Sequence, residues 1–68
     1  MKRLNEKLRE LRSQLGISQK QAAKDMGITP TAYSNYEQGL REPSLETLKI
    51  ICEYYGVTAD YLIGLEDY

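Results

Sequence analysis

Four uncharged hydrogen-bonding side chains recur at helical spacing in the middle of the chain. The positions i, i+3, i+4 and i+7 of one helix face are occupied by Thr31, Ser34, Asn35 and Gln38. An Asn amide matches the N6 and N7 atoms of adenine, and Thr or Ser can pair with several base edges. None of the four is acidic, so the face would not repel phosphates. We interpret it as a candidate surface for reading duplex DNA, with an ordinary solvated helix face as the alternative.

Residues for other kinds of chemistry are scarce. The chain has no histidine and a single cysteine, Cys52, so the commonest general base, the commonest metal ligand and any internal disulfide are missing. It also has no phosphate-cradling glycine loop and no paired carboxylates in apolar surroundings. We therefore expect no enzyme activity, cofactor, metal or small-molecule substrate, and we interpret Cys52 as an apolar core residue.

Charge is distributed unevenly, although the formal net charge is only -1. Residues 1–41 carry eight Lys/Arg against four Asp/Glu, a balance of +4. Residues 42–68 carry one Lys against six Asp/Glu, a balance of -5. This asymmetry suggests a face that attracts a polyanion, and an ordinary mixed surface is the alternative.

The length of 68 residues allows one domain, which we place at 1–68. Uninterrupted apolar stretches reach only two or three residues, too few to span a bilayer. The N-terminus also lacks the apolar region of a signal peptide. We therefore expect a cytoplasmic protein with no membrane partner.

Glycines and hydroxyl residues divide the chain into five segments with helical periodicity. The glycines that end these segments are Gly16, Gly27, Gly39, Gly56 and Gly64. Four segments follow a hydroxyl residue that can cap a helix, namely Ser18, Thr29, Ser44 and Thr58. Pro30 suits the first helical position, and Ser18 with Gln21 predicts a reciprocal capping box. No strand pattern competes, so the predicted fold class is all-α.

The apolar side of each segment predicts the core. In the first segment the apolar stripe consists of Leu4, Leu8, Leu11 and Leu15. The second segment would bury Ala22, Ala23 and Met26, and the fourth would bury Leu45, Leu48, Ile51, Cys52 and Tyr55. Four tyrosines also fall on inward faces, which favours core packing over stacking on single-stranded nucleic acid: Tyr33, Tyr36, Tyr55 and Tyr61.

The second and third segments are joined across Met26-Gly27-Ile28-Thr29, with the small Ala23 where the two helices approach each other. This arrangement is typical of a helix-turn-helix unit. Similar units occur in purely structural bundles, so the unit favours DNA binding only together with the polar face described above.

The stretch from Arg9 to Leu65 resembles the phage-repressor and Cro-type helix-turn-helix family, called XRE or lambda-repressor-like. The resemblance is carried by Leu11-Arg12, Gly16-Ile17-Ser18-Gln19, residues 23–29, Tyr36-Glu37-Gln38-Gly39, residues 41–48 and Tyr55-Gly56-Val57. It implies a five-helix lambda-repressor-like DNA-binding domain in which the second and third helices form the helix-turn-helix. The third helix would then enter the major groove.

The resemblance also implies roles for individual residues. Thr31 and Asn35 would read bases, and Pro30 would contact a base only through an apolar group such as a thymine methyl. Ser34, which shares the polar face, is a further candidate base reader. The residues implied to hold backbone phosphates are Gln19, Gln38, Arg41 and the helix start at Ser18. The family pairs an arginine of the first helix with a glutamate of the third, here Arg12 and Glu37, and a DNA-facing Arg12 is the alternative.

Two base readers would supply about 2–6 kcal/mol of discrimination, whereas specific binding needs about 4–10 kcal/mol. We therefore expect a homodimer on a palindromic operator with half-sites about 34 Å apart. The residues expected to join the two copies are Tyr61, Ile63, Leu65 and Tyr68. The predicted function is transcriptional regulation, most simply repression of a prophage, mobile-element or host operon. The alternative is an antitoxin-like protein-interaction module that binds DNA secondarily.

Overall fold

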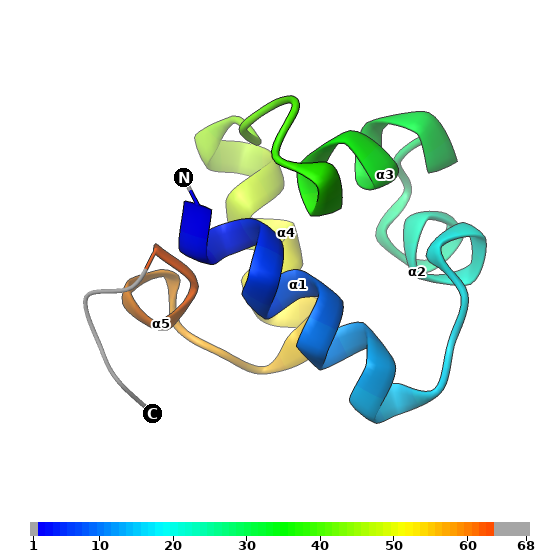
Figure 1. Ribbon diagram of the computed structural model, residues 1–68, viewed down its shortest axis with the longest axis horizontal. Coiled ribbons are helices and arrows are strands. Elements are labelled where there is room, and N and C mark those ends of the chain that lie inside the picture. Colours follow the sequence, from blue (N-terminus) through cyan, green and yellow to red (C-terminus); the bar gives the residue numbers. More distant parts are fainter. Residues whose placement is uncertain (1, 64–68) are drawn as a thin grey trace.

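Five helices make up the part of the chain that the computed structural model describes, residues 2–63 with side chains from residue 4 onward (Figure 1). In chain order they are α1 (Lys2–Leu15), α2 (Gln19–Met26), α3 (Pro30–Gln38), α4 (Leu45–Tyr55) and α5 (Ala59–Ile63). Residues 2–63 contain no strand, so the predicted all-α fold class is confirmed. None of these helices has the length and apolar character needed to cross a membrane.

Each helix from α2 to α5 begins directly after the hydroxyl residue predicted to cap it. The Oγ atom of Ser18 accepts a hydrogen bond from the backbone N of Gln21 at 3.0 Å. Thr29 Oγ1 accepts from the backbone N of Ala32 at 3.1 Å, and Ser44 and Thr58 make equivalent bonds. These bonds satisfy amide groups that no helix carbonyl can reach, so they define where each helix begins.

The capping box predicted for α2 forms only in part. Ser18 accepts from the Gln21 backbone, but Gln21 Nε2 donates to Asp25 Oδ1 at 2.7 Å. The Gln21 side chain is therefore directed along the helix and not back toward Ser18. The reason is the charge of the competing acceptor, because a hydrogen bond to an ionised carboxylate is stronger than one between neutral groups.

The end of α3 depends on the left-handed backbone of Gly39, with φ 75°. In this conformation the Gly39 amide points back to the carbonyls of Asn35 and Tyr36. A residue with a Cβ atom would adopt this backbone at a cost of about 1–2 kcal/mol. The helix stop predicted at Gly64 lies outside the described residues.

The core lies where α1, α2, α3, α4 and α5 meet. Its fully or nearly fully buried apolar side chains are Leu4, Leu8, Ala22, Ala23, Met26, Tyr33, Ile51 and Leu62. Other predicted core residues are partly buried and pack against this cluster: Leu11, Tyr36, Leu48, Cys52, Tyr55 and Tyr61. The periodicity therefore identified most of the core.

Two leucines predicted to face inward are exposed instead. Leu15 is 55% exposed and Leu45 is 86% exposed. Leu15 is the last residue of α1, whose C-terminal end projects beyond the helices packed against it (Figure 1). Leu45 is the first residue of α4. At both helix ends the apolar periodicity continues past the point where a neighbouring helix covers it.

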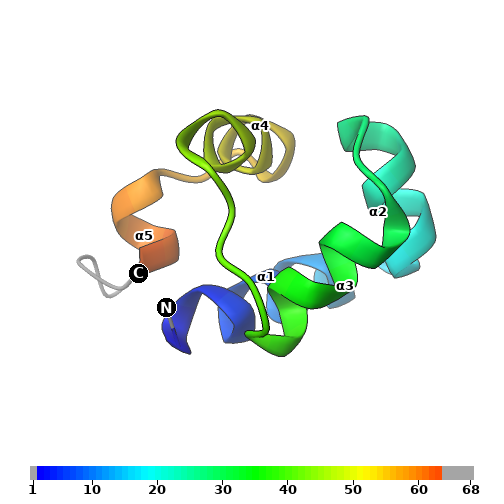
Figure 2. The same cartoon turned by 90° about the horizontal axis from the view of Figure 1, so that it is seen from above.

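The packing leaves one side of α3 uncovered. α1 packs against α3 and α5, and α2 packs against α3 and α4. Figure 2 shows α5 and α2 at opposite ends of the molecule and the segment after α3 crossing to α4. α1 and α2, the helices that contact α3, therefore cover one of its faces and leave its other face open to solvent.

Candidate nucleic-acid interface

The two faces of α3 differ in burial. Tyr33 and Glu37 point inward and are 0% and 1% exposed. On the opposite side, the exposed predicted residues are Pro30, Thr31 and Gln38, and the half-buried ones are Ser34 and Asn35. The structure thus brings all four predicted base readers and Gln38 to one accessible side of a single rigid element.

The side-chain amide of Asn35 is available for hydrogen bonding on this side. Its side-chain amide makes no hydrogen bond within the described chain, so its donors and its acceptor are free for a base edge. Ser34 and Gln38 pair with each other instead, because Gln38 Nε2 donates to Ser34 Oγ at 2.7 Å. The Ser34 hydroxyl hydrogen and the Gln38 carbonyl oxygen remain available in this pair.

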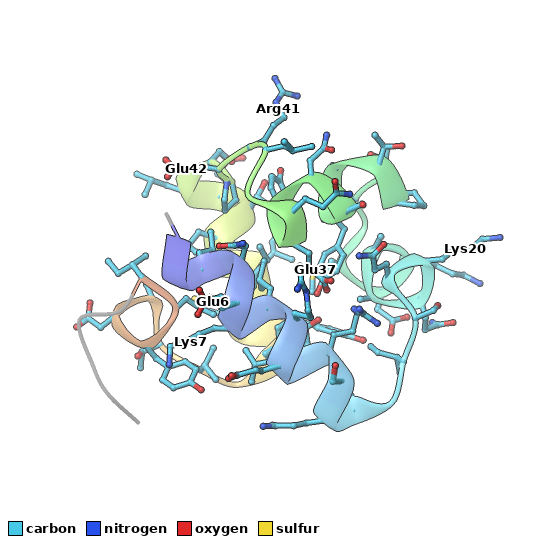
Figure 3. All side chains as sticks on the ribbon, in the orientation of Figure 1. Glu6, Lys7, Lys20, Glu37, Arg41 and Glu42 are labelled. Atoms are coloured by element: carbon cyan, nitrogen blue, oxygen red, sulfur yellow. The ribbon has the colours of Figure 1, made fainter. Side chains whose placement is uncertain are left out.

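A buried ion pair ties α3 to α1. Arg12 Nε donates to Glu37 Oε2 at 2.6 Å and Arg12 Nη2 donates to Glu37 Oε1 at 3.2 Å, a bidentate geometry. Arg12 Nη1 also donates to the carbonyl of Ile17 at 2.9 Å. The Arg12 side chain is only 20% exposed. The structure therefore joins the two residues that the family resemblance pairs, and Figure 3 shows Glu37 in the interior of the molecule, next to α1.

The pKa of each partner in this ion pair is shifted in the direction that favours its charged form. Burial, the largest influence, raises the pKa of Glu37, but hydrogen bonds from Arg12 and Gln19 outweigh it and hold that pKa below its ordinary value. The hydrogen bond to Glu37 is the main cause of a raised pKa for Arg12. Both groups are thus charged near neutral pH. A carboxylate as deeply buried as this one stays ionised only because a partner compensates its charge.

Gln19 connects α2 to the same carboxylate. Gln19 Nε2 donates to Glu37 Oε1 at 3.0 Å, so α1, α2 and α3 meet at one side chain. The sequence patterns did not predict this contact, because the two residues are 18 positions apart. The Gln19 amide group carries a second hydrogen for any further acceptor. Ser18, the other residue predicted at this helix start, is exposed.

Arg41 lies just beyond α3 with its side chain directed away from the molecule (Figure 3). The backbone amides of Leu40 and Arg41 both donate to the carbonyl of Asn35, at 2.9 and 3.4 Å. The segment carrying Arg41 is therefore anchored to the same residue whose side chain is free on the open face of α3.

A second set of contacts between distant residues fixes α2 and α3 against α4. Tyr54 OH donates to Asp25 Oδ2 at 2.6 Å, and this hydrogen bond is the main reason that the pKa of Tyr54 rises to about 12. The hydroxyls of Tyr33 and Tyr55 are 2.6 Å apart. No local spacing relates the partners, so sequence patterns could not reveal these pairs.

The structure describes only half of the predicted contact between copies. Tyr61 and Ile63 are half-buried, and Lys7 Nζ lies 3.9 Å from the centroid of the Tyr61 ring. Leu65 and Tyr68 lie outside the described residues.

Within the described residues, no group of three His, Cys, Asp or Glu side chains could hold a metal ion. Burial raises the pKa of the Cys52 thiol, which disfavours a reactive thiolate.

Two short helices crossing at a tight turn, with the second one open along a polar face, define a helix-turn-helix domain. A helix-turn-helix family model matches residues 8–62. The chain therefore belongs to the helix-turn-helix family of XRE type. No solved structure matches it significantly.

Curated relatives carry names of transcriptional regulators. The chain is 38% identical over 64 residues to the HTH-type transcriptional regulator ImmR of Bacillus subtilis, covering 94% of this chain and 50% of ImmR. It is 33% identical over 58 residues to the cryptic phage CTXphi transcriptional repressor RstR of Vibrio cholerae, covering 85% and 52%. It is 38% identical over 63 residues to the HTH-type transcriptional activator BcrR of Enterococcus faecalis, covering 93% and 31%. The chain thus spans about half the length of ImmR and RstR, and less of BcrR.

Proposed function

We propose that this chain binds duplex DNA sequence-specifically and regulates transcription. In this proposal α3 enters the major groove, Thr31 and Asn35 read base edges, and Ser34 and Pro30 contact neighbouring bases. Backbone phosphates are held by Gln19, Gln38, Arg41 and the start of α2 at Ser18. The observation that carries the proposal is the open polar face of α3. The buried ion pair between Arg12 and Glu37 fixes the opposite face of this helix to α1.

The proposal extends to the biological setting. We place residues 1–68 in one DNA-binding domain of a cytoplasmic, non-enzymatic regulator that binds a palindromic operator as a homodimer. Repression by blocking a promoter is the simplest outcome, and the name of RstR supports it. The name of BcrR shows that a relative of similar identity is an activator, so the sign of regulation needs its own measurement.

Selection from random duplex DNA tests the proposal. We expect a short enriched motif and a steep loss of affinity as salt rises, because released counterions drive phosphate binding. Footprinting on a selected duplex should protect two half-sites. Failure to enrich any sequence would contradict base reading, and binding that salt does not weaken would contradict groove binding.

Asn35→Ala is the sharpest test of the reading face. Its amide has no internal partner, so truncation should leave folding intact while lowering affinity for the selected sequence by about 5- to 150-fold per bound copy, as expected for about 1–3 kcal/mol per good base contact. Affinity for unrelated duplex should hardly change. Gln14→Ala, which removes an exposed amide on α1, is the matched control and should alter neither affinity. Equal losses on selected and unrelated duplex would show that Asn35 does not read sequence.

A further inference from the structure

The first turn of α3 exposes carbon, whereas the rest of the open face exposes hydrogen-bonding groups. Pro30, the first residue of the helix, is exposed, and its pyrrolidine ring has neither a donor nor an acceptor. In Figure 1 this turn lies at the outer edge of the molecule, beside α2. The turn therefore adds an apolar surface to the side of α3 that carries Thr31 and Asn35, the proposed base readers.

The backbone of this turn also offers few hydrogen-bond donors. Pro30 has no amide hydrogen, and the Ala32 amide donates to Thr29 Oγ1 at 3.1 Å. The Tyr33 amide donates to the Thr29 carbonyl, also at 3.1 Å. Among the first four residues of α3, only the Thr31 amide is left without an acceptor in the described chain. A turn with a single free amide is poorly suited to an anion, which needs several donors.

Charge is absent from the accessible side of α3 as well. The helix contains no Lys or Arg, and its first turn contains no acidic residue. Its one carboxylate, Glu37, is 1% exposed and paired with Arg12. An exposed surface that is both apolar and uncharged is matched best by an apolar group, because such a contact leaves no polar group without a partner.

The major groove of duplex DNA presents one apolar group among its donors and acceptors, the 5-methyl group of thymine. From this match we infer that Pro30 reads the 5-methyl group of a pyrimidine in the operator. The inference rests on the proposed function and assigns Pro30 a base chemistry. Because the ring has no polar group, 5-methylcytosine offers it the same contact as thymine, whereas uracil and cytosine do not.

Helix geometry predicts where this pyrimidine lies. Pro30 precedes Asn35 by five positions, which corresponds to about 7.5 Å along the helix axis. Successive base pairs of duplex DNA are about 3.4 Å apart. The pair that Pro30 contacts should therefore lie within about two base-pair steps of the pair that Asn35 reads.

Single-base changes in a selected duplex isolate the methyl group. At each thymine of the motif, affinity is measured with thymine, uracil, cytosine or 5-methylcytosine, and the opposite base is changed to match. At the position that Pro30 contacts, the methyl group should raise affinity about 4-fold per bound copy, as expected for the burial of one such group. The increment should appear in both comparisons, thymine over uracil and 5-methylcytosine over cytosine. Pro30→Ala should remove most of it.

Pro43→Ala is the matched control. It removes the other proline of the chain, which lies between α3 and α4, and it should keep the wild-type methyl increment. Thermal melting of both variants establishes that each is folded at the temperature of the titration. The pair read by Asn35 is the one at which Asn35→Ala loses discrimination.

Two results would overturn the inference while sequence-specific binding stands. One is a methyl increment that Pro30→Ala leaves unchanged. The other is a motif with no methyl-sensitive pyrimidine within about two base-pair steps of the pair that Asn35 reads. A wild-type chain that binds no duplex at all would instead overturn the proposed function.

Discussion

Glu37 is the one charged residue that is buried within the described part of the chain. It is 1% exposed and accepts hydrogen bonds from Arg12 and Gln19, so one carboxylate joins three helices. Arg9 adds a bond from α1 to the Glu37 carbonyl at 3.3 Å. Removing one partner of a buried pair leaves the other charge uncompensated, which typically costs about 3–5 kcal/mol. A domain of 68 residues has little stability to lose, so this pair decides whether α3 is held in place.

Glu37→Gln should therefore destabilise the fold, and the loss should depend on pH. The pKa of Glu37 is lower in the folded chain than in the unfolded chain. Its contribution is consequently complete above the unfolded value, about 4.3, and disappears as pH falls through the lower folded value. Urea midpoints for the wild type and the variant should differ most near neutral pH and converge in acid.

Two controls accompany this measurement. Glu10→Gln removes an exposed carboxylate from α1 and should change stability by less than about 0.5 kcal/mol. Arg12→Ala should lower the melting temperature of the protein, and this loss of stability should be its primary effect, ahead of any loss of DNA affinity. Unchanged melting of Arg12→Ala with weakened DNA affinity would assign Arg12 to the DNA and contradict its structural role.

At the scale of elements, caps define where each helix begins and packing defines which side is open. α3 combines a Thr29 cap, Pro30 in its first turn and a left-handed Gly39 at its end. α1 and α2 pack against the inner face of the same helix. The caps therefore fix where α3 begins and ends, and the packing fixes which of its faces is open. The polar face can be presented to solvent only when both conditions are met.

Thr29→Ala tests the contribution of a cap. The variant loses the hydrogen bond from Ala32 N to Thr29 Oγ1, which should cost about 1 kcal/mol. For a domain of this size the melting temperature should fall by about 4–8 °C. Thr29→Ser keeps the hydroxyl and should melt close to the wild type. Equal melting of the Ala and Ser variants would mean that the cap does not stabilise the folded chain.

On the scale of the whole molecule, the distribution of charge matters more than its sum. The net charge is -1, yet residues 1–41 have a balance of +4, and Glu37, one of their four acidic residues, is buried against Arg12. An overall acidic chain can in this way present a positive surface to a polyanion. Tyr61, proposed to join two copies, already has Lys7 over its ring, so Ile63 and the residues after it would supply most of the remaining apolar contact.

Sedimentation of a chain that ends at Gly64 tests this arrangement. We expect the full chain to place two copies on one selected duplex, and the shortened chain to assemble there more weakly because Leu65 and Tyr68 are absent. Melting of the shortened chain alone provides the control for folding. Assembly as strong as that of the full chain would remove the C-terminal residues from the proposed interface.

Local sequence patterns were sufficient to predict the helices and most of the side chains that they bury. Hydroxyl caps and glycines act within a few residues of the backbone groups they satisfy, so local patterns marked the starts of α2 to α5 and the end of α3. The polar face of α3 follows from helical spacing in the same way. These features depend on short-range geometry that the order of residues fixes.

Which groups meet across helices depends on how the helices pack. The packing left Leu15 and Leu45 in solvent, and it joined Gln19 to Glu37 and Asp25 to Tyr54. Periodicity assigns a residue to a face but not to the stretch of that face that a neighbour covers. Contacts between residues far apart in the chain depend on how complete helices pack, which no local spacing encodes.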